Sequence, residues 1–521
     1  IFAGIQAATG EIAKPKYIFN KADVVLSLDS DFLQMDSNDI PHARDFASRR
    51  KVRSEKDSMN RLYVVEGTYT ITGGMSDHRL RVQSGQVGMF AAALAHELSA
   101  QGLDISAPRV NADFDKKWIS EVAKDLIAHN GQSLIVAGRR QPAEVHALVA
   151  LMNDVLGNTD QTVSYISNPD MRVSSLKDFV ELNKDMNESK IDALIILGGN
   201  PVYQAPADVD FLSGLGKVPF SVHLASHVDE TSSNTSWHIP AAHFLESWGD
   251  VSGYGGAGIV QPLIAPLFDG KSQVDVLADL ISDEEIWAYA EVQETWKSIL
   301  GENNFEKAWR KVLHDGFIAE TRETAVAFNK TRAQGFVSMS RYYAPSASST
   351  DLEVIFTASF TNYDGRYANN GWMQELPDPV TKVTWDNVAL ISANTAKHFK
   401  VKNEGLLRIS GNGSDVTLPV WIQPGMADNT IALELGYGRE VGRVSTGVGS
   451  NVSTLRSATA MNISMGFTAE KAFGEYTLAC VQDHHGFDEE KLAADAIQER
   501  LPTILRESTL ADYQKDPEFA M

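Results

Sequence analysis

Two glycine-rich turns that follow predicted buried strands carry the residues best suited to hold a phosphate group. Gly198-Gly199-Asn200-Pro201 follows the apolar run at 191–197, and Gly138-Arg139-Arg140 follows the run at 133–137. Glycines at the carboxyl end of a parallel strand let backbone N–H groups approach an anion closely. A plain tight turn is the alternative interpretation of each motif, because a single glycine-rich turn is a weak signal.

A second polar stretch combines carboxylates, hydroxyls and aromatic residues at 229–249. It begins with Asp229-Glu230-Thr231, and Glu246 near its end is a candidate general acid or base. A catalytic carboxylate needs surroundings that perturb its pKa, and a sequence does not display them. We therefore expect Glu246 to anchor a loop through backbone hydrogen bonds.

Metal-binding and nucleophilic motifs are sparse. Asp483-His484-His485 holds the one adjacent histidine pair, and no third or fourth ligand lies at the close spacing that a zinc site needs. Cys480 is the single cysteine, which excludes an internal disulfide and any iron–sulfur cluster held wholly by this chain. We expect Cys480 to be a buried structural thiol. The sequence therefore assigns no catalytic residue and no metal ligand.

The segments around these motifs alternate between apolar runs and amphipathic stretches. Strands are predicted at 22–33, 61–74, 133–138, 191–201 and 219–226, and helices at 87–98, 118–130, 142–157 and 175–186. This alternation indicates parallel α/β layers. Short strands with frequent Gly and Pro follow at 352–478 and indicate a β domain. We predict an α/β domain at 1–112, a second α/β domain at 113–340, a β domain at 341–480 and a tail at 481–521.

The bulk composition narrows the partners. The chain has 521 residues and a formal net charge of −22, which argues against nucleic acid because phosphate is bound mainly by Lys and Arg. An acidic protein can steer a basic partner such as a small cationic electron carrier, or the charge can serve solubility alone. No apolar run reaches the roughly 18 residues of a membrane span.

Together these segments resemble the molybdopterin oxidoreductase superfamily across nearly the whole chain. ADVVLSLDSDF at 22–32 and DALIILGGNP at 192–201 are similar to the strands of its two nucleotide-binding layers, and DETSSNTSWHIPAAHFLESWGD at 229–250 resembles the loop beneath its cofactor. The stretch at 385–438 resembles its C-terminal barrel. The resemblance implies an α/β plus β fold, with two Rossmann-like parallel α/β layers followed by a double-psi β-barrel.

Four further motifs resemble the large periplasmic iron–sulfur subunit of alternative complex III, a quinol-oxidising respiratory complex. They are YDGRYANNGWMQELPDPVTKVTWDN at 363–387, ESWGDVSGYGG at 246–256, LGYGREVGRVSTGVGSN at 435–451 and QDHHG at 482–486. In that family a molybdopterin-like half without molybdenum is joined to a ferredoxin-like half that holds several iron–sulfur clusters. The resemblance implies that this chain is most of the first half, cut before the cluster-bearing part. It also implies twin-arginine export and a place on the periplasmic side of the bacterial inner membrane.

Two departures from working molybdenum enzymes imply an empty cleft. Glu66-Gly67-Thr68 stands where such enzymes usually carry Asp-Pro-Arg, and Gly85-Gln86-Val87 stands where they carry Gly-Thr-Asp. Each lost polar contact costs on the order of 1–3 kcal/mol, so two losses weaken cofactor binding by roughly 10²–10⁴-fold. The residues expected to line the vestigial cleft are Gly198, Gly199, Asn200, Asp229, Glu230, Thr231, Trp385 and Asn387.

Two functions follow from the resemblance. The first is a non-catalytic scaffold module, without a cofactor in this segment, that contacts other subunits of a membrane-bound respiratory complex, among them a cytochrome c-type subunit. The alternative is part of an active molybdenum or tungsten oxidoreductase. In that case Gly198–Pro201, Asp229–Thr231 and Trp385–Asn387 would contact the pterin nucleotides of molybdopterin.

Overall fold

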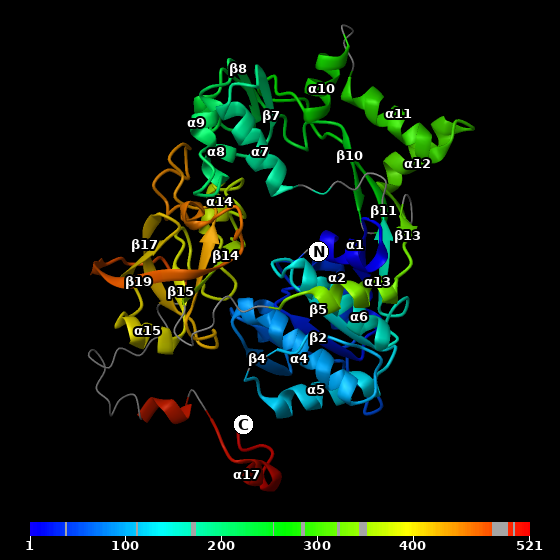
Figure 1. The fold of residues 1–521 in the computed structure, drawn as a ribbon, viewed down its shortest axis with the longest axis vertical. Coiled ribbons are helices and arrows are strands. Elements are labelled where there is room, and N and C mark those ends of the chain that lie inside the picture. Colours follow the sequence, from blue (N-terminus) through cyan, green and yellow to red (C-terminus); the bar gives the residue numbers. More distant parts are fainter. Residues whose placement is uncertain are drawn as a thin grey trace.

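Three bodies make up the molecule: an α/β domain, a smaller second α/β domain and a β-barrel (Figure 1). The computed structural model describes residues 1–36, 39–110, 113–167, 173, 175–253, 255–282, 287–319, 323–342, 352–481, 499–503 and 506–520. In Figure 1 the first α/β domain and the barrel lie side by side, and the second α/β domain lies at the top.

The first α/β domain is built on a four-stranded parallel sheet with the order β4-β3-β2-β5. Its strands are β2 (Val24–Leu28), β3 (Arg61–Glu66), β4 (His78–Arg81) and β5 (Ser133–Ala137). The helices that accompany it are α1 (Phe2–Thr9), α2 (Asp39–Ser48), α3 (Ile71–Gly74), α4 (Val87–Ala100), α5 (Lys116–Ala128), α6 (Ala143–Val155) and α13 (Lys330–Met339). Strands β2 and β5 are buried throughout, as expected of continuous apolar runs in a parallel sheet.

The first sheet crosses the domain boundary predicted at residue 112. Strand β5 pairs in parallel with β2, so Leu28 lies beside Ala137. The main apolar core runs from Ile5 through Leu156 and takes in Ala333 and Val337 of α13. The chain therefore leaves this domain near residue 167 and returns to it near residue 323. Alternation of strands and helices reveals the elements but not which sheet each strand joins.

A small antiparallel sheet marks the point where the chain leaves and returns. Its order is β1-β6-β13, with β1 at Lys14–Tyr17, β6 at Val163–Ser167 and β13 at Thr324–Ala325. Strand β6 pairs with both neighbours, so the outgoing and incoming segments are held together at the edge of the first domain.

The second α/β domain has a three-stranded parallel sheet, β7 (Ala193–Leu197), β8 (Phe220–Ala225) and β9 (Trp237–Pro240). Helices α7 (Leu176–Asn187), α8 (Pro201–Gln204) and α9 (Phe211–Leu215) accompany it, and a small core forms around Met186 and Phe211. An antiparallel sheet of β10 (Gly249–Gly253), β11 (Gly256–Val260) and β12 (Phe317–Ala319) follows, with α10 (Gln273–Ile281), α11 (Ala288–Leu300) and α12 (Phe305–Asp315).

The third body is a closed barrel with the strand order β14-β18-β15-β17-β16-β19. Its strands are β14 (Leu352–Ala358), β15 (Ala389–Ile391), β16 (Gly405–Gly411), β17 (Ser414–Ile422), β18 (Thr430–Leu435) and β19 (Ile463–Glu475). The pairs β14–β18 and β15–β17 are parallel, and the other pairs are antiparallel. Short helices α14 (Gly371–Glu375) and α15 (Ala393–Phe399) lie in its loops, and α17 (Leu510–Lys515) lies in the tail.

The sequence predicts α/β layers followed by a β-barrel, and the structure confirms this coarse architecture with parallel α/β sheets and a closed six-stranded barrel. Within the described residues, no helix combines the length and apolar character that crossing a bilayer requires.

Candidate functional site

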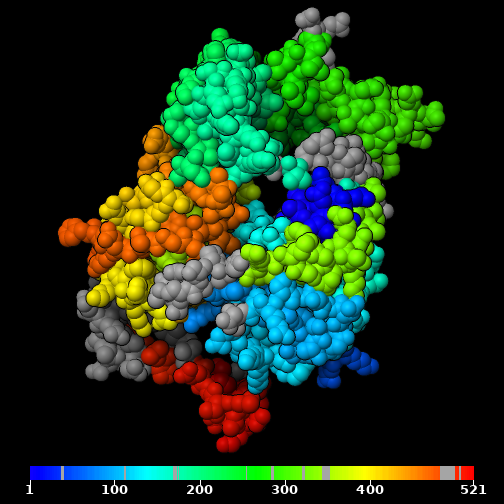
Figure 2. Space-filling view, viewed as in Figure 1, coloured from blue at the N-terminus to red at the C-terminus, as the bar shows by residue number. Residues whose placement is uncertain are grey.

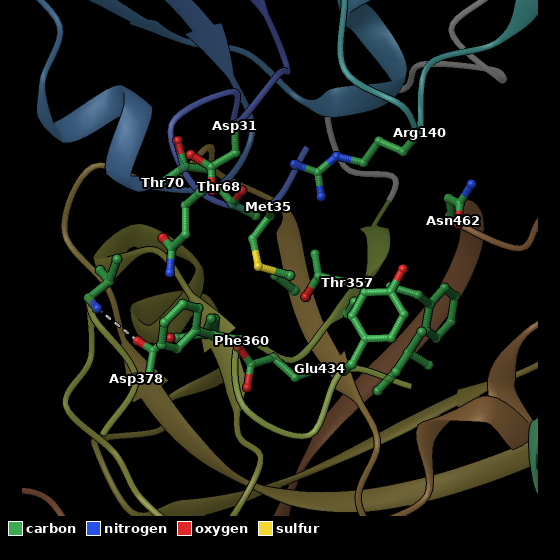
Figure 3. A pocket seen from close by; sticks show the side chains of 18 of the residues that line it. Asp31, Met35, Thr68, Thr70, Arg140, Thr357, Phe360, Asp378, Glu434 and Asn462 are labelled. Carbon is green, nitrogen blue, oxygen red and sulfur yellow. Dashed lines mark hydrogen bonds between the residues drawn. The ribbon is translucent and has the colours of Figure 1, made fainter. Parts of the chain in front are cut away.

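A cavity of about 560 Å³ lies between the first α/β domain and the barrel. The loops after β2, β3 and β5 form one wall, and strands β14 and β18 with the loop at 378–381 form the other (Figure 3). The carboxyl ends of parallel strands are where open α/β sheets bind ligands. This cavity is therefore the candidate site.

Asp29 organises the α/β wall. It has a positive φ of 57°, and its carboxylate accepts hydrogen bonds from Arg140 Nε at 2.8 Å, Gln141 Nε2 at 2.9 Å and Ser84 Oγ at 3.0 Å. A Cβ atom on Gly138 would lie 1.7 Å from the Asp29 carbonyl oxygen, so only glycine lets the two loops pass. The Arg140 guanidinium is therefore committed to a carboxylate of its own domain.

Two more carboxyl groups of the same wall are held by hydroxyls. The Asp31 carboxyl group accepts hydrogen bonds from the backbone N–H of Thr72 at 3.1 Å and from the Thr72 hydroxyl at 2.7 Å. The Asp36 carboxyl group accepts a hydrogen bond from the Ser30 hydroxyl. Burial raises the pKa of both carboxyl groups, although these hydrogen bonds act in the opposite direction. This part of the wall holds carboxyl groups that lose their protons less readily than free ones.

The barrel wall is mostly apolar, and Glu434 is the carboxyl group that its strands β14 and β18 contribute. Phe356, Phe360, Leu390 and Met426 line it, and Glu434 of β18 points into the cavity among them (Figure 3). No hydrogen bond to the Glu434 carboxyl group is formed by the described residues. Burial, with a smaller contribution from the negative charge of Asp378, raises the pKa of Glu434 to about 8. At neutral pH this side chain is therefore mostly protonated and can donate a hydrogen bond.

Two further guanidinium groups reach the cavity. Arg139 lies 5.9 Å from the centre of the Tyr363 ring, and Arg456 donates from Nε to the Met461 carbonyl at 2.8 Å. Burial lowers the pKa of Arg456 to about 10. Neither side chain pairs with a carboxylate of the described residues.

Carboxyl groups outnumber guanidinium groups around the cavity. The acidic residues are Asp29, Asp31, Asp36, Asp364, Asp378 and Glu434, and the basic residues are Arg139, Arg140 and Arg456. Arg140 is already bound to Asp29. Burial raises the pKa of Asp31, Asp36 and Glu434, so the negative charge around the cavity is smaller than the number of its carboxyl groups.

Asn200, Glu230 and Thr231 lie together in the structure, and none of the three lines this cavity. The Glu230 carboxylate accepts from Asn200 Nδ2 at 2.6 Å, and Arg439 of the barrel lies 2.7 Å from it. Asn200 Oδ1 accepts from the Thr231 hydroxyl at 2.7 Å. We call these four residues the Glu230 cluster. It connects the second α/β domain to the barrel loop after β18.

The Glu230 cluster is buried and electrostatically strong. Glu230 is 6% exposed and Arg439 5% exposed. Backbone N–H groups of Glu440 and Val441 donate to the same carboxylate at 2.8 and 3.0 Å. Burial alone would raise the pKa of Glu230, but hydrogen bonds from Arg439, Val441 and Asn200 outweigh it and lower the pKa to about 2. Groups of this protein therefore occupy the acceptor oxygens of the Glu230 carboxylate.

The two glycines of the 198–201 motif serve a turn. Gly198 and Gly199 have positive φ values of 81° and 76°, which glycine adopts at low cost. The Gly199 carbonyl lies 3.0 Å from His223 Nε2, within a cluster where Asp229 lies 3.5 Å from His223 Nδ1. None of these residues lines the cavity.

Trp385 and Asn387 lie in the barrel loop before β15. Asn387 Nδ2 donates to the carbonyls of Glu434 and Ser450, each at 2.9 Å, and the Trp385 backbone has a positive φ of 65°. Neither residue lines the cavity, so none of the eight predicted cleft residues does. Their assignment to a cofactor cleft stays a prediction.

The sequence interpretation missed Glu353, which fills the position opposite Gly85. Glu353 of β14 accepts from the backbone N–H groups of Ser84 at 3.0 Å and Gly85 at 2.7 Å, at the start of α4. Its side chain is fully buried, and burial raises its pKa to about 7, although the two N–H groups oppose the rise. The sequence signal that could have revealed this role is Glu353 itself, the single charged residue in the mostly apolar strand 352–358.

The other predicted departure, Glu66, is also satisfied internally. Glu66 pairs with Arg79 at 2.7 Å and accepts from the Thr70 hydroxyl at 2.6 Å. Arg79 continues to the barrel by donating to the Gly425 carbonyl at 2.6 Å. Thr68, two residues after Glu66, lines the cavity. Glu66 therefore contributes to the contact between the two bodies.

The remaining predicted residues have plain structural roles. Glu246 Oε2 accepts from the His243 backbone N–H at 3.0 Å, so it anchors its loop as predicted. Cys480 is partly exposed rather than buried, because strand β19 ends at Glu475 and the chain beyond it runs near the surface. Asp483-His484-His485 lies outside the described residues. Among the described residues, no group of three or more His, Cys, Asp and Glu side chains is arranged to hold a metal ion.

No family model matches the chain. The chain is 24% identical to a protein of Nitratidesulfovibrio vulgaris named menaquinone reductase, molybdopterin-binding-like subunit. The match extends over 493 residues and covers 84% of this chain and 68% of that protein. It shares its fold with acetylene hydratase from Pelobacter acetylenicus, with a TM-score of 0.61 over 90% of this chain and 80% of that chain at 12% identity. Both likenesses support the prediction of a molybdopterin oxidoreductase-like protein.

Proposed function

We propose that this chain, which resembles a quinone reductase subunit and has a molybdopterin oxidoreductase-like fold, is a non-catalytic scaffold module of a respiratory electron-transfer complex. The name of the Nitratidesulfovibrio vulgaris relative, a subunit of menaquinone reductase, supports an assembly of several subunits that acts on a quinone. The resemblance of four motifs supports alternative complex III as the type of complex. The parallel β14–β18 and β15–β17 pairs support the double-psi topology of the barrel.

The main support for this proposal is the poor fit between the cavity and a pterin nucleotide. Such a nucleotide carries phosphate, yet the Arg140 guanidinium, which lines the cavity, is already bound to the Asp29 carboxylate. The backbone N–H groups of Ser84 and Gly85, which lie in the turn that leads into α4 and would suit an anion, are occupied by Glu353. The residues present therefore do not fit molybdopterin, and we derive no chemical step through it.

In this proposal the segment contributes shape and contacts. The iron–sulfur clusters that carry electrons belong to another part of the assembly, and a cytochrome c-type subunit accepts electrons from them. The segment lies on the periplasmic side of the inner membrane. Glu353, Arg79 and the Glu230 cluster hold the three bodies together without a bound cofactor.

The alternative is an active molybdenum or tungsten oxidoreductase. The retained cavity favours it, because 560 Å³ lies within the range of cofactor sites, about 300–1,000 Å³.

Metal and pterin analysis of the chain, purified within its native complex, separates the two functions. We expect less than about 0.1 molybdenum or tungsten atom per chain, and no fluorescent pterin product after oxidative extraction. A molybdenum enzyme taken through the same purification and extraction serves as the positive control. Stoichiometric metal or pterin would overturn the scaffold proposal and establish the alternative.

A further inference from the structure

Helix α10 has an apolar side that nothing in the described structure covers. Leu277, Leu280 and Ile281 occupy positions i, i+3 and i+4 and are strongly exposed, with Ile281 at 79%. Val276 and Ala278 on the same helix are buried. A helix that is apolar on both sides is normally buried on both, because a surface helix turns polar residues outward.

The loop before α10 extends this apolar surface. Leu263, Ile264, Leu267 and Phe268 are all more than half exposed, with Phe268 at 80%. Backbone hydrogen bonds hold the loop in place: Leu263 N–H donates to the Leu245 carbonyl at 2.7 Å, and Lys271 N–H donates to the Pro240 carbonyl at 2.9 Å. The exposed side chains therefore stand on a tethered backbone.

The loop leads directly into the helix, and we call their exposed apolar side chains together the apolar face (residues 263–268 with Leu277, Leu280 and Ile281). Ser272 joins them, because its hydroxyl and Asp275 form a capping box at the start of α10. Gln273 Nε2 donates to the Leu197 carbonyl at 3.1 Å, which places the helix start at the end of β7. Figure 1 shows α10 beside the second sheet at the top of the molecule, and Figure 2 shows this part at the outer surface.

The size of the apolar face approaches that of a specific interface. Burying one large aliphatic side chain corresponds to roughly 100 Å² at about 25 cal/mol per Å², so these side chains present on the order of 500 Å² of apolar surface. The largest apolar patch on a typical monomer is about 300–600 Å² and is often functional. A standard interface buries about 800 Å² on each partner, polar rim included.

Carboxylates predominate in the chain segments that carry and flank the apolar face. Between residues 240 and 282 the carboxylates are Glu246, Asp250, Asp269, Asp275 and Asp279, and Lys271 is the single Lys or Arg. Lys271 lies 3.3 Å from Asp279, so it is already paired. A surface of this kind is complementary to a partner whose apolar contact area is bordered by Lys and Arg.

We propose that the apolar face is the docking site for a partner subunit that presents an apolar contact area bordered by basic residues. The inference rests on the proposed function, because it assigns a surface to the subunit contacts that a scaffold module must make. A second copy of this chain fits less well, since a symmetric contact would bring the same acidic border against itself. A bilayer also fits less well, because segments that lie in a membrane interface are rich in Lys and Arg.

The test uses the full chain in its native complex. Phe268→Glu and Leu280→Glu each place a carboxylate in the middle of the apolar face, and we expect either variant to weaken retention of the partner subunit by at least about 30-fold. Phe473→Glu is the matched control, because Phe473 is a fully exposed phenylalanine on the barrel strand β19. Unchanged thermal unfolding of each isolated variant establishes that its fold is intact.

A photoreactive phenylalanine analogue at position 268 identifies the occupant. A cross-link to a co-purifying subunit, through a peptide with apolar residues flanked by Lys or Arg, supports the proposal. A cross-link to lipid, a cross-link to a second copy of the chain, or unchanged subunit retention in both variants overturns it. If the unaltered chain co-purifies with no other subunit at all, the proposed function fails as well, which distinguishes the two failures.

Discussion

Glu434 shows how one residue can set the chemistry of the cavity. Its carboxyl group lies against the apolar barrel wall, while the other acidic groups gather mainly on the α/β wall and the 378–381 loop. Burial raises its pKa to about 8, so at neutral pH it presents a hydrogen-bond donor to the cavity. This side chain adds no full negative charge there until the pH is well above neutral.

The raised pKa of Glu434 predicts a loss of stability at alkaline pH. The folded pKa, about 8, lies above the unfolded value of about 4.3. The contribution of Glu434 is therefore fully present below about pH 4.3 and is lost as pH rises through about 8. Glu434→Gln cannot ionise, so it does not undergo this loss. The melting temperature of the variant minus that of the unaltered protein should therefore increase between pH 6 and pH 9, by roughly 2–4 °C for each ~1 kcal/mol of unfolding free energy.

Thermal unfolding at a series of pH values measures this effect. Glu375→Gln is the control, because Glu375 is exposed in a neighbouring barrel loop, and its difference from the unaltered protein should not vary with pH. A Glu434→Gln difference that is equally flat would contradict the raised pKa.

At the scale of elements, the start of α4 is completed by a strand of another body. The turn at Ser84–Gln86 presents two N–H groups, and β14 brings the Glu353 carboxylate to them from 268 residues further along the chain. The first N–H groups of a helix lack partners within the helix and need an acceptor. Strand β14 therefore supplies an acceptor that a ligand would otherwise provide.

Removing that acceptor should destabilise the contact between the first domain and the barrel. Glu353→Ala removes the acceptor of two N–H groups, one buried and one partly buried, each at a cost of about 1–3 kcal/mol, so we expect a loss of roughly 2–6 kcal/mol in urea unfolding. Hydrogen exchange of the Ser84 and Gly85 amides should accelerate. Glu353→Gln keeps one acceptor oxygen and should lose less. Equal losses in both variants would indicate that packing, and not the hydrogen bonds, accounts for the effect.

At the scale of the whole molecule, the Glu230 cluster holds the second α/β domain to the barrel. Arg439 also lies 4.9 Å from the centre of the Tyr203 ring, and the Tyr203 hydroxyl donates to the Tyr437 carbonyl at 2.6 Å. These contacts join segments more than 200 residues apart. The parallel sheet of the second α/β domain has a small apolar core around Met186 and Phe211, and the polar contact with Arg439 joins this part of the domain to the barrel.

Breaking the buried pair should be costly. Arg439→Ala leaves the Glu230 carboxylate buried without its cation, and such a change costs about 3–5 kcal/mol. Chemical unfolding measures the loss, and Lys177→Ala is the control, because Lys177 forms an exposed helix pair with Glu181 that is expected to contribute under about 0.5 kcal/mol. A loss for Arg439→Ala as small as that of the control would contradict a stabilising role for the pair.

The same pair predicts acid sensitivity. The folded pKa of Glu230, about 2, lies below the unfolded value of about 4.3. Its stabilising contribution is present above about pH 4.3 and is lost as pH falls through about 2. The difference in unfolding free energy between Arg439→Ala and the unaltered protein should therefore shrink as the pH falls from 5 toward 2.

Much of the fold can be predicted because its signals are local. The apolar runs that become β2, β5 and β7 and the amphipathic stretches that become α4, α5 and α6 each declare themselves within about a dozen residues. The barrel segment is recognisable from its short strands and its resemblance to a known family. The membership of β5 in the first sheet was not predicted, because pairing between β2 and β5 spans more than 100 residues.

The sequence alone determined the order of elements, the α/β-then-β architecture and the absence of an internal disulfide, because these depend on residue types and their local spacing. The tertiary structure decided which residues face one another. It placed Gly138–Arg140 and Glu434 around one cavity, Glu353 at the start of α4, and Asn200, Glu230 and Thr231 in a contact with Arg439. These pairings join side chains far apart along the chain, and only the packing of the three bodies determines them.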